Sequence, residues 1–358
     1  MTNYGFSPEL VAPVLGFGRF RFRRWLIALA GLAIRLQART FRAPAGTLIG
    51  RIGENGLLNV IGMGVVPSRG VRRGVITDID VATRSIEESV RKACTLARFG
   101  SEDVHAGLAD ANRMPLRVPD LDLYHPWDLT PAAAIELATA CEAAALDSDP
   151  RVTNSEGASL SVSEGLHVYG NSHGFIGGFP TTRHSLSCAV VGQEGEAMQR
   201  DYWWTSARAA ADLDAPRSVG ERAAERTCSR LGARRLSTRE APVLFRAEVA
   251  TGLLRGLTSA IQGASLYRRA SFLLDHLDER IFPEFVRIHE EPLLPRGLAS
   301  AAFDGDGVAT WPKDLVSEGV LRTYLLDAYS GCRLGLPTTG NAGGVRNLRI
   351  AMGERDRA

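Results

Sequence analysis

Residues 242–261 read Pro242-Val-Leu-Phe-Arg-Ala-Glu-Val-Ala-Thr-Gly-Leu-Leu-Arg-Gly-Leu-Thr-Ser-Ala-Ile261, and the organisation of the chain follows from this stretch. Its first four residues are mostly apolar, which predicts a short buried strand at 242–245. Leucine and isoleucine then recur at positions 253, 254, 257 and 261, and this spacing predicts a helix. A strand that leads into a helix is a common place for a functional site, because the free amides of the helix N-terminus collect there.

Two further helices are predicted upstream of this stretch. An apolar stripe at residues 86–97, with Thr83 as the cap and Gly100 as the stop, predicts the first. Thr130 followed by Pro131 predicts the start of the second, because a hydroxyl cap precedes a proline in the first turn. The predicted apolar face of this second helix consists of Ile135, Ala138, Cys141 and Ala145.

The segment between residues 151 and 204 has a different pattern. Short runs alternate between polar and apolar residues and are separated by Gly and Asn, which predicts an antiparallel meander. Residues 219–231 return to a helical pattern, 297–310 indicate turn-rich β structure, and 321–329 indicate a strand or short helix. Together these segments predict an α+β protein with antiparallel sheets and flanking helices, in several domains.

The composition is that of an ordinary globular protein, with 45% hydrophobic and 23% charged residues. The net charge of +2 is uneven, since residues 1–77 carry +9 and the remainder −7. The larger part of the chain is therefore acidic, which argues against nucleic-acid binding. The five cysteines form no Cys-x-x-Cys pair, which favours free thiols in a reducing cytoplasm over disulfides or a structural zinc site.

The N-terminal region contains one segment with the outline of a signal peptide. A basic run at residues 19–24 precedes ten apolar residues at 25–34. The apolar run is too short to span a bilayer, which takes about 20 residues. It also begins too far from Met1 for an ordinary signal peptide. We therefore expect a cytoplasmic protein without a membrane segment.

Residues 170–174 read Gly-Asn-Ser-His-Gly and match the Gly-x-Ser-x-Gly pattern of a nucleophile elbow. An elbow must lead into a helix, whereas the next residues, Phe-Ile-Gly-Gly-Phe-Pro, cannot start one. A hairpin turn that uses Gly and Asn is the favoured interpretation. The alternative is an independent hydrolase that uses Ser172 with His173 or His184.

The histidines give no pattern typical of a metal site, because no two of the seven have the i, i+3 or i, i+4 spacing of helical ligands. His289 begins a run that resembles His-Glu-x-x-His, but Leu293 stands at the second position and Pro292 would break the helix. We expect His289 to be a surface loop residue. His167 and His184 are predicted on opposite strands of the meander, where they would form a cross-strand polar pair.

Five segments, taken in order, resemble the TldD/PmbA family of bacterial metalloproteases. They are Thr-Arg-His-Ser-Leu-Ser at 182–187, Arg-Asp-Tyr at 200–202, Glu-Val-Ala-Thr-Gly at 248–252, Phe-Leu-Leu-Asp at 272–275 and Gly-Leu-Ala-Ser at 297–300. The resemblance extends from about Asp80 to Asn347, three quarters of the chain. Each segment alone would be a weak signal, whereas their common order is a specific one.

In the catalytic, TldD-like subunit of this family, the matching helix carries His-Glu-x-x-x-His, which holds zinc and supplies the general base. Here Ala247 and Gly252 replace the two histidines, and neither offers a side-chain lone pair to a metal. The chain therefore resembles the PmbA (TldE-like) subunit, which lacks the zinc ligands. Glu248 stands at the motif glutamate, but without a zinc-bound water it has no proton to remove. We expect no catalytic residue, metal ligand or cofactor in this chain.

The resemblance implies the non-catalytic subunit of a cytoplasmic zinc metalloprotease complex that degrades or processes unfolded peptides. A TldD-like catalytic partner would supply the zinc. This chain would complete the chamber and position an extended peptide, by strand addition to its sheet. The family is also linked to maturation of a peptide antibiotic and to modulation of DNA gyrase. A second alternative is a non-enzymatic remnant of a disrupted gene.

The resemblance also implies a domain organisation. Residues 79–118 would be the remainder of an N-terminal domain, 119–235 a middle domain, and 240–358 a C-terminal domain that lacks the last strands of the family. Residues 1–78 do not resemble the family and stay unassigned. We interpret them as a misassigned or out-of-frame start, with a divergent N-terminal domain as the alternative.

Overall fold

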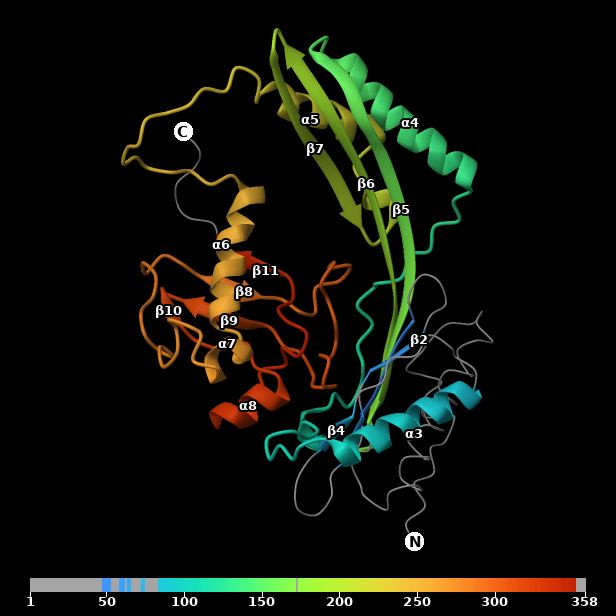
Figure 1. Cartoon of the computed structure of the whole chain (residues 1–358), viewed down its shortest axis with the longest axis vertical. Helices are drawn as coiled ribbons and strands as arrows, with labels where there is room; N and C mark the ends of the chain where they lie inside the picture. The colour runs from blue at the N-terminus through green and yellow to red at the C-terminus, as the bar shows by residue number, and fades with distance from the viewer. Residues whose placement is uncertain are drawn as a thin grey trace. The chain divides into compact units, whose positions relative to one another are not determined.

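The computed structural model describes residues 47–52, 58–61, 63–65, 72–74, 83–171 and 173–351. They form two compact units (Figure 1). The first unit takes in the described residues up to Leu121, Gly165–Pro180, and those from Arg246 onward. The second consists of Asp122–Glu164 and Thr181–Phe245. The long strands β5 (Val152–Asn171) and β6 (Ile176–Glu194) contribute residues to both units.

The second unit is an antiparallel meander with two helices packed on it. β6 pairs with β7 (Ala197–Ala207) from His184 opposite Ala207 to Glu194 opposite Ala197. Figure 1 shows α4 (Pro131–Ser148) and α5 (Pro216–Cys228) beside these strands, and the short helix η3 (Ala210–Asp212) precedes α5. The meander predicted between residues 151 and 204 and the helix predicted near 219–231 are therefore confirmed.

The start of α4 is as predicted, but its buried face is not. Thr130 is the N-cap, and its Oγ1 accepts a hydrogen bond from the Ala133 amide at 3.3 Å. Cys141 is buried as expected, whereas Ile135 is 66% exposed, so its predicted place on the apolar face was wrong. The reason is a close contact between α4 and α5: a Cβ at Gly220 would lie 2.1 Å from the carbonyl oxygen of Cys141. Only glycine allows this approach, and small side chains fill the interface.

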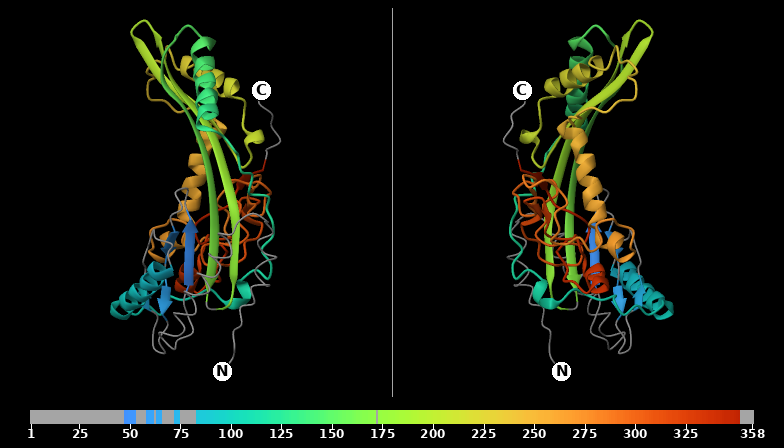
Figure 2. Two further views of the ribbon diagram at one scale, coloured as in Figure 1. Left: turned by 90° about the vertical axis from the view of Figure 1, so that its right-hand side faces the viewer. Right: turned by 90° about the vertical axis from the view of Figure 1, so that its left-hand side faces the viewer.

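The C-terminal part of the first unit packs helices against a small sheet. The sheet has the order β10-β9-β8-β11, formed by Val320–Leu321, Lys313–Ser317, Ile288–Glu290 and Leu348–Ile350. The helices are α6 (Ala247–Ala260), α7 (Gly263–Tyr267) and α8 (Ala328–Leu334). In both views of Figure 2, α6 lies at the side of this orange-to-red part of the chain. Its core includes Leu257, Ile261, Leu266, Leu315 and Leu326.

Residues 242–245, predicted to be a buried strand, do not form one. They are irregular, and the side chains of Val243, Leu244 and Phe245 are exposed. A strand needs a hydrogen-bonded neighbour, and this segment pairs with none of the described strands. Further along, residues 297–310 are turn-rich with an isolated bridge between Phe303 and Ala309. Residues 320–334 contain both a strand, β10, and a helix, α8.

The remaining described elements of the first unit come from the N-terminal half of the chain. α3 (Thr83–Phe99) is the first predicted helix, followed by η2 (Ala111–Arg113). The five-stranded sheet has the order β2-β1-β5-β6-β7, with β1 (Thr47–Ile52) antiparallel to both β2 (Leu58–Ile61) and β5. β3 (Met63–Val65) pairs with β4 (Arg72–Gly74). The rest of residues 1–78, including the signal-like run, lies outside the described residues.

None of the helices in the described part of the chain is both long and apolar enough to cross a membrane.

Candidate functional site

The site indicated by the sequence lies in the first turns of α6. The helix begins after Arg246, whose side chain provides no cap. Its carbonyl oxygen instead accepts hydrogen bonds from the amides of Val249 and Ala250, at 2.9 and 2.8 Å. The second half of the helix is fixed by apolar packing, since Leu257 is buried in the core. The first turns of α6 are thus stabilised mainly by hydrogen bonds within the helix, whereas its C-terminal half packs in the core.

The three motif positions lie in these first turns. Ala247 and Gly252 are exposed, and Glu248 is half-buried. The hydroxyl of Thr251 donates a hydrogen bond to the Glu248 carbonyl oxygen at 2.8 Å. A Cβ added at Gly252 would meet no atom within 4 Å, so a larger side chain would fit there. Positions 247 and 252 lack a donor atom, because neither the methyl group of alanine nor the hydrogen of glycine can bind a metal.

A metal ion would therefore need ligands from elsewhere in the chain. Among the described residues, no three His, Cys, Asp or Glu side chains are placed to hold one ion. Zinc in proteins takes at least three protein ligands. The described residues therefore do not fit a zinc ion.

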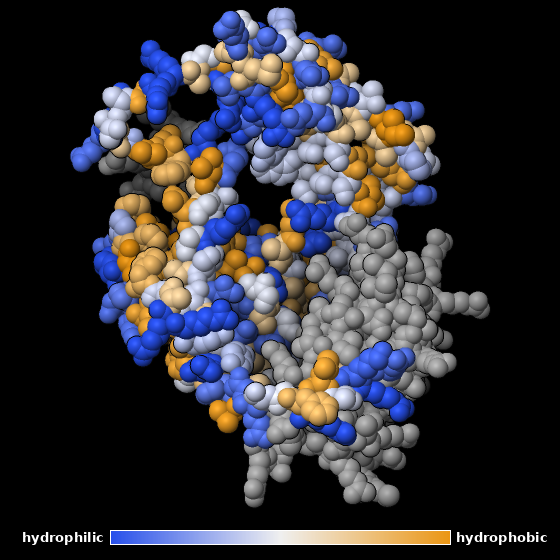
Figure 3. All heavy atoms as spheres, viewed as in Figure 1, coloured by the Kyte–Doolittle hydropathy of each residue, from blue (hydrophilic) through white to orange (hydrophobic). Residues whose placement is uncertain are grey.

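An apolar surface borders the motif. Val249 and Leu253 of α6 are exposed, although both lie close to the motif positions in the helix. Figure 3 shows hydrophobic atoms near the first turns of α6. Neighbouring exposed apolar side chains of this kind mark interaction surfaces.

A buried polar network lies in the same unit and was not foreseen from the sequence. Glu290, at the end of β8, is fully buried, and its Oε2 lies 2.9 Å from Nζ of Lys313 at the start of β9. Its Oε1 accepts hydrogen bonds from the Arg346 amide at 2.6 Å and from Nδ2 of Asn341 at 2.9 Å. The network therefore ties the loop before β11 to the centre of the sheet.

Lys313 makes further contacts on its other side. Its ammonium group donates to the Thr339 carbonyl oxygen at 2.7 Å and lies 4.4 Å from the centroid of the Trp311 ring. Burial lowers the pKa of Lys313, and the charge of Glu290 opposes this effect. Lys313 is one of two lysines in a chain whose other basic residues are arginine. The scarcity of lysine in this chain is the sequence signal that could have drawn attention to this position, although no prediction was based on it.

Asp304 forms a hydrogen bond to the same loop, residues 338–347, at a second position. Its Oδ1 accepts hydrogen bonds from the amides of Asp306 and Val308 at 2.9 and 3.0 Å, and its Oδ2 from the Ala342 amide at 2.9 Å. Burial and, second to it, the charge of the nearby Asp306 raise the pKa of Asp304 to about 7, and the amide hydrogen bonds oppose the shift. The buried acids Asp304 and Glu290 thus both fasten the loop at residues 338–347.

The turn at residues 170–174 is a hairpin, as favoured from the sequence. β5 ends at Asn171, whose amide donates to the Phe175 carbonyl oxygen at 3.0 Å, and Gly174 has a φ of 88°. Ile176 then begins β6 rather than a helix, so the segment lacks the geometry of a nucleophile elbow. Ser172 itself lies outside the described residues.

The histidines considered in the sequence have separate partners. His173 Nε2 lies 3.1 Å from the Ala109 carbonyl oxygen, and His184 Nε2 lies 2.9 Å from that of His125. His167 packs against the rings of Phe179 and Phe303, with centroids 5.3 and 5.6 Å away. We expected a polar cross-strand pair for His167, and the structure instead places it among aromatic rings.

His289 was expected in a surface loop, and this was wrong. It lies in β8, where its Nδ1 is 2.7 Å from Oδ1 of Asp314 on the neighbouring strand β9. Its Nε2 is 3.7 Å from a carboxylate oxygen of Glu291. The strand pairing between β8 and β9 places this acidic partner opposite the histidine, a relationship that local sequence did not reveal.

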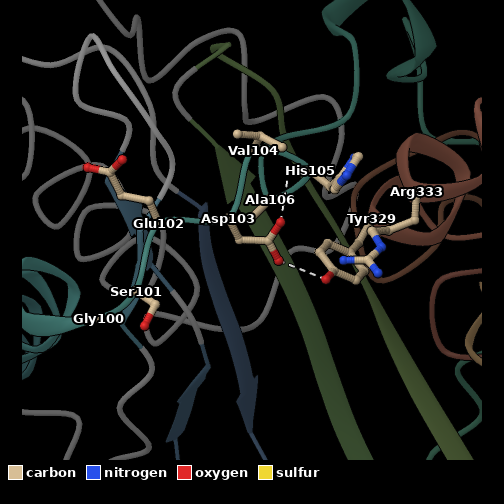
Figure 4. Close-up of a pocket in the computed structure, with 9 residues that line it drawn as sticks. All are labelled: Gly100, Ser101, Glu102, Asp103, Val104, His105, Ala106, Tyr329 and Arg333. Carbon is tan, nitrogen blue, oxygen red and sulfur yellow. Dashed lines mark hydrogen bonds between the residues drawn. The ribbon is translucent and has the colours of Figure 1, made fainter. Parts of the chain in front are cut away.

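A polar cavity of about 710 Å³ lies between residues 100–106 and α8 (Figure 4). The Tyr329 hydroxyl donates to Oδ2 of Asp103 at 2.7 Å, and the His105 amide donates to Oδ1 at 3.0 Å. The bond from Tyr329 is the largest cause that lowers the pKa of Asp103, followed by the amide bond, with the charges of His105 and Arg333 contributing. Asp103 is thus a fixed anion at this cavity.

Comparison with known proteins identifies relatives that match residues 124–231 and 238–358. The model of the PmbA/TldA metallopeptidase central domain matches residues 124–231, and that of the C-terminal domain matches residues 238–358. Metalloprotease PmbA of Escherichia coli O157:H7 is 47% identical over 280 residues, covering 78% of this chain and 62% of the relative. The PmbA homolog of Haemophilus influenzae is 43% identical, with 80% and 64% covered.

A crystal structure described as a putative modulator of DNA gyrase, from Bacteroides thetaiotaomicron, has a similar fold. It superposes with a TM-score of 0.81 at 26% identity and covers 91% of this chain and 77% of that one. This chain spans less than two thirds of the length of the curated relatives named above.

Proposed function

The chain belongs to the PmbA/TldD metallopeptidase family, and on this premise we propose that it is the non-catalytic subunit of a two-chain zinc metalloprotease that processes unfolded peptides. The observation that carries the proposal is the set of residues in the first turns of α6. Ala247 and Gly252 occupy the positions of the metal-binding histidines, and Glu248 alone is kept. The family and the α+β fold expected from the sequence are confirmed.

The loss of the two ligands determines what Glu248 does. In a metal-assisted hydrolase, the general base removes a proton from a water molecule whose acidity the metal has increased. Because Ala247 and Gly252 offer no side-chain donor atom, this helix provides no metal-bound water for the Glu248 carboxylate to deprotonate. A carboxylate in the first turn of a helix still stabilises that helix, because it lies near the positive end of the dipole. Glu248 in this chain is a helix-stabilising residue.

The second unit supplies a place for an extended peptide. Among the described strands, β7 is the last in its sheet, so a peptide can add to its outer edge through main-chain hydrogen bonds. Every second side chain of β7 points outward, and Met198, Tyr202 and Trp204 are exposed. The rings of Tyr202 and Trp204 lie 5.6 Å apart. Main-chain hydrogen bonds and contacts with aromatic rings bind a peptide with little dependence on its sequence. A subunit that binds varied unfolded peptides needs this low sequence specificity.

The partner we propose is a TldD-like chain in the cytoplasm, which brings the zinc and the general base. The exposed apolar residues Val249 and Leu253 suit a protein interface, because burying them removes apolar surface from water. They adjoin the degenerate motif in α6, so a partner bound there would bring its own residues to this part of the chain.

Co-purification of this chain with a TldD-like protein from the same cell tests the proposal. The complex is assayed on an unstructured peptide, with and without a zinc chelator. We expect a stable complex whose cleavage is sensitive to chelator and needs both chains. A well-folded chain that forms no complex contradicts the proposal. An aggregating chain that forms none supports the alternative of a remnant of a disrupted gene.

A further inference from the structure

Cys332 and His105 form a close pair that the function above does not use. Cys332 lies on α8 and is exposed, and its Sγ is 3.5 Å from Nδ1 of His105. The two residues are 227 positions apart in the sequence. At this distance the thiol can pass its proton to the imidazole ring. The other cysteines with described side chains, Cys141, Cys188 and Cys228, are buried.

The surroundings of the pair are charged. Asp103 lies beside His105, and Arg333 follows Cys332 on α8; both His105 and Arg333 act on the Asp103 carboxylate. In Figure 4, Arg333 and Tyr329 approach from α8, while Asp103 and His105 approach from the opposite loop. His105, which contacts the thiol, lines a polar cavity that is large enough for a small peptide.

Two other roles for the pair do not fit. A hydrolytic triad needs the acid to hold the histidine ring, whereas Asp103 bonds to the His105 amide and to the Tyr329 hydroxyl. A metal site needs a third ligand, and none of the described side chains supplies one. What remains is a thiol nucleophile, Cys332, with a neighbouring histidine as its proton acceptor.

We propose that Cys332 is a site of reversible S-thiolation, with a small peptide disulfide of the glutathione class as its co-reactant. The thiol proton moves to Nδ1 of His105, and the Cys332 thiolate attacks one sulfur of the disulfide. A sulfur–sulfur bond forms between protein and peptide as the bond within the peptide disulfide breaks. The leaving peptide thiolate takes up the proton from His105. One disulfide is consumed and one is formed, and a reduced peptide thiol reverses the reaction.

The cavity also gives this ligand class a chemical match. A glutathione-type peptide carries carboxylates and an ammonium group, and the cavity presents the guanidinium of Arg333 to the former and the carboxylates of Glu102 and Asp103 to the latter. Both contacts join opposite charges, which makes them stronger than hydrogen bonds between neutral groups. This proposal does not depend on the peptidase role, since it concerns α8 and residues 100–106 alone.

The test incubates the full chain with glutathione disulfide and follows the adduct on each cysteine by peptide mapping with mass spectrometry. We expect Cys332 to react first and Cys332→Ser to remove that adduct. His105→Gln should slow the reaction about tenfold at pH 7, because an ordinary thiol is only a few per cent thiolate there. The rates of wild type and His105→Gln should converge at high pH, where hydroxide rather than His105 removes the thiol proton. His276→Gln, a change at a histidine outside the cavity, should leave the rate unchanged.

The pH profile separates an acid–base role for His105 from a structural one. A structural role would lower the rate by a similar factor at every pH, whereas proton transfer to His105 requires the difference to disappear as pH rises. The wild-type chain gives an independent measurement that needs no variant. A Cys332 rate that rises with pH as that of an unassisted thiol contradicts the proposal. Equal adduct formation on all the cysteines also contradicts it.

Discussion

Nζ of Lys313 lies 2.9 Å from Oε2 of Glu290, and the two side chains are 9% and 0% exposed. Removing both charges from water is costly, and their mutual attraction together with hydrogen bonds from Asn341 and the Arg346 amide offsets that cost. The pair joins the adjacent strands β8 and β9 and fixes the loop that follows α8. Breaking this buried ion pair would therefore destabilise the C-terminal part of the chain.

Lys313→Met leaves the Glu290 carboxylate buried without its cation. We expect the free energy of unfolding to fall by about 3–5 kcal/mol, the usual effect of removing one partner of a buried pair. Urea unfolding measures it. Lys92→Met is the matched control, because Lys92 pairs with Glu88 on the exposed face of α3 at 2.7 Å. This control should cost less than about 1 kcal/mol. If both variants lost the same free energy of unfolding, the pair of Lys313 and Glu290 would be no more important to stability than an exposed pair, which would contradict this prediction.

The raised pKa of Asp304, about 7, makes stability depend on pH. An unfolded aspartate has a pKa of about 3.9, so between roughly pH 4 and 7 the folded chain keeps a proton that the unfolded chain has lost. The contribution of Asp304 to the free energy of unfolding therefore falls as pH rises through that window, by at most about 1.4 kcal/mol per pH unit. It levels off above pH 7.

Asp304→Asn tests this pH dependence, since asparagine does not titrate. The amide also alters the hydrogen bond with the Ala342 amide, so the variant is less stable by an amount that is independent of pH. We expect the difference in unfolding free energy between variant and wild type to shift in favour of the variant as pH rises from 5 to 7.5. A difference that is constant with pH would mean that Asp304 is ionised throughout.

α6 offers a contrast between two leucines one turn apart. Leu257 is 7% exposed in the core, whereas Leu253 is 59% exposed. Leu257→Ala should lower the free energy of unfolding by about 2–5 kcal/mol, because it removes buried carbon and leaves a cavity. Leu253→Ala should change it by less than about 0.5 kcal/mol. Thermal and urea unfolding of both variants measure the contrast. Similar losses would show that the outer face of α6 is also packed.

The outer side chains of β7 should contribute to peptide binding. Trp204→Ser removes an exposed aromatic ring from the strand edge, and we expect the affinity of the two-chain complex for an unstructured labelled peptide to fall about tenfold. Fluorescence anisotropy of the labelled peptide measures the affinity. Leu116→Ser is the control, since Leu116 is an exposed apolar residue of the other unit. Unchanged affinity in Trp204→Ser would exclude β7 as the peptide site.

Local patterns predicted those parts of the fold that local interactions determine. The Thr130 cap, the alternation of β6 and the hairpin turn before Ile176 each depend on a few neighbouring residues. The predicted strand at 242–245 failed because a strand also needs a partner, which its own sequence cannot supply. Ile135 was misplaced because the approach of α5 decides which side of α4 is buried.

The candidate site likewise has a part that local sequence predicted and a part that it did not. The degenerate motif at residues 247–252 is contiguous, so the sequence revealed the missing ligands directly. The network around Glu290 joins residues that are 51 and 56 positions apart, and the Cys332–His105 pair joins residues 227 apart. No periodicity or short motif connects such residues. The pairing of β8 with both β9 and β11, and the contacts of α8 with residues 103–105, bring them together.

The central claim is that this chain contributes no catalytic base to peptide cleavage. The most direct test is the chelator-sensitive cleavage rate of the two-chain complex when the motif glutamate is changed to glutamine in one chain at a time. We expect the change in the TldD-like partner to abolish cleavage and Glu248→Gln in this chain to leave the rate unchanged. Loss of cleavage in Glu248→Gln, with the complex still intact and the partner unaltered, would contradict the account.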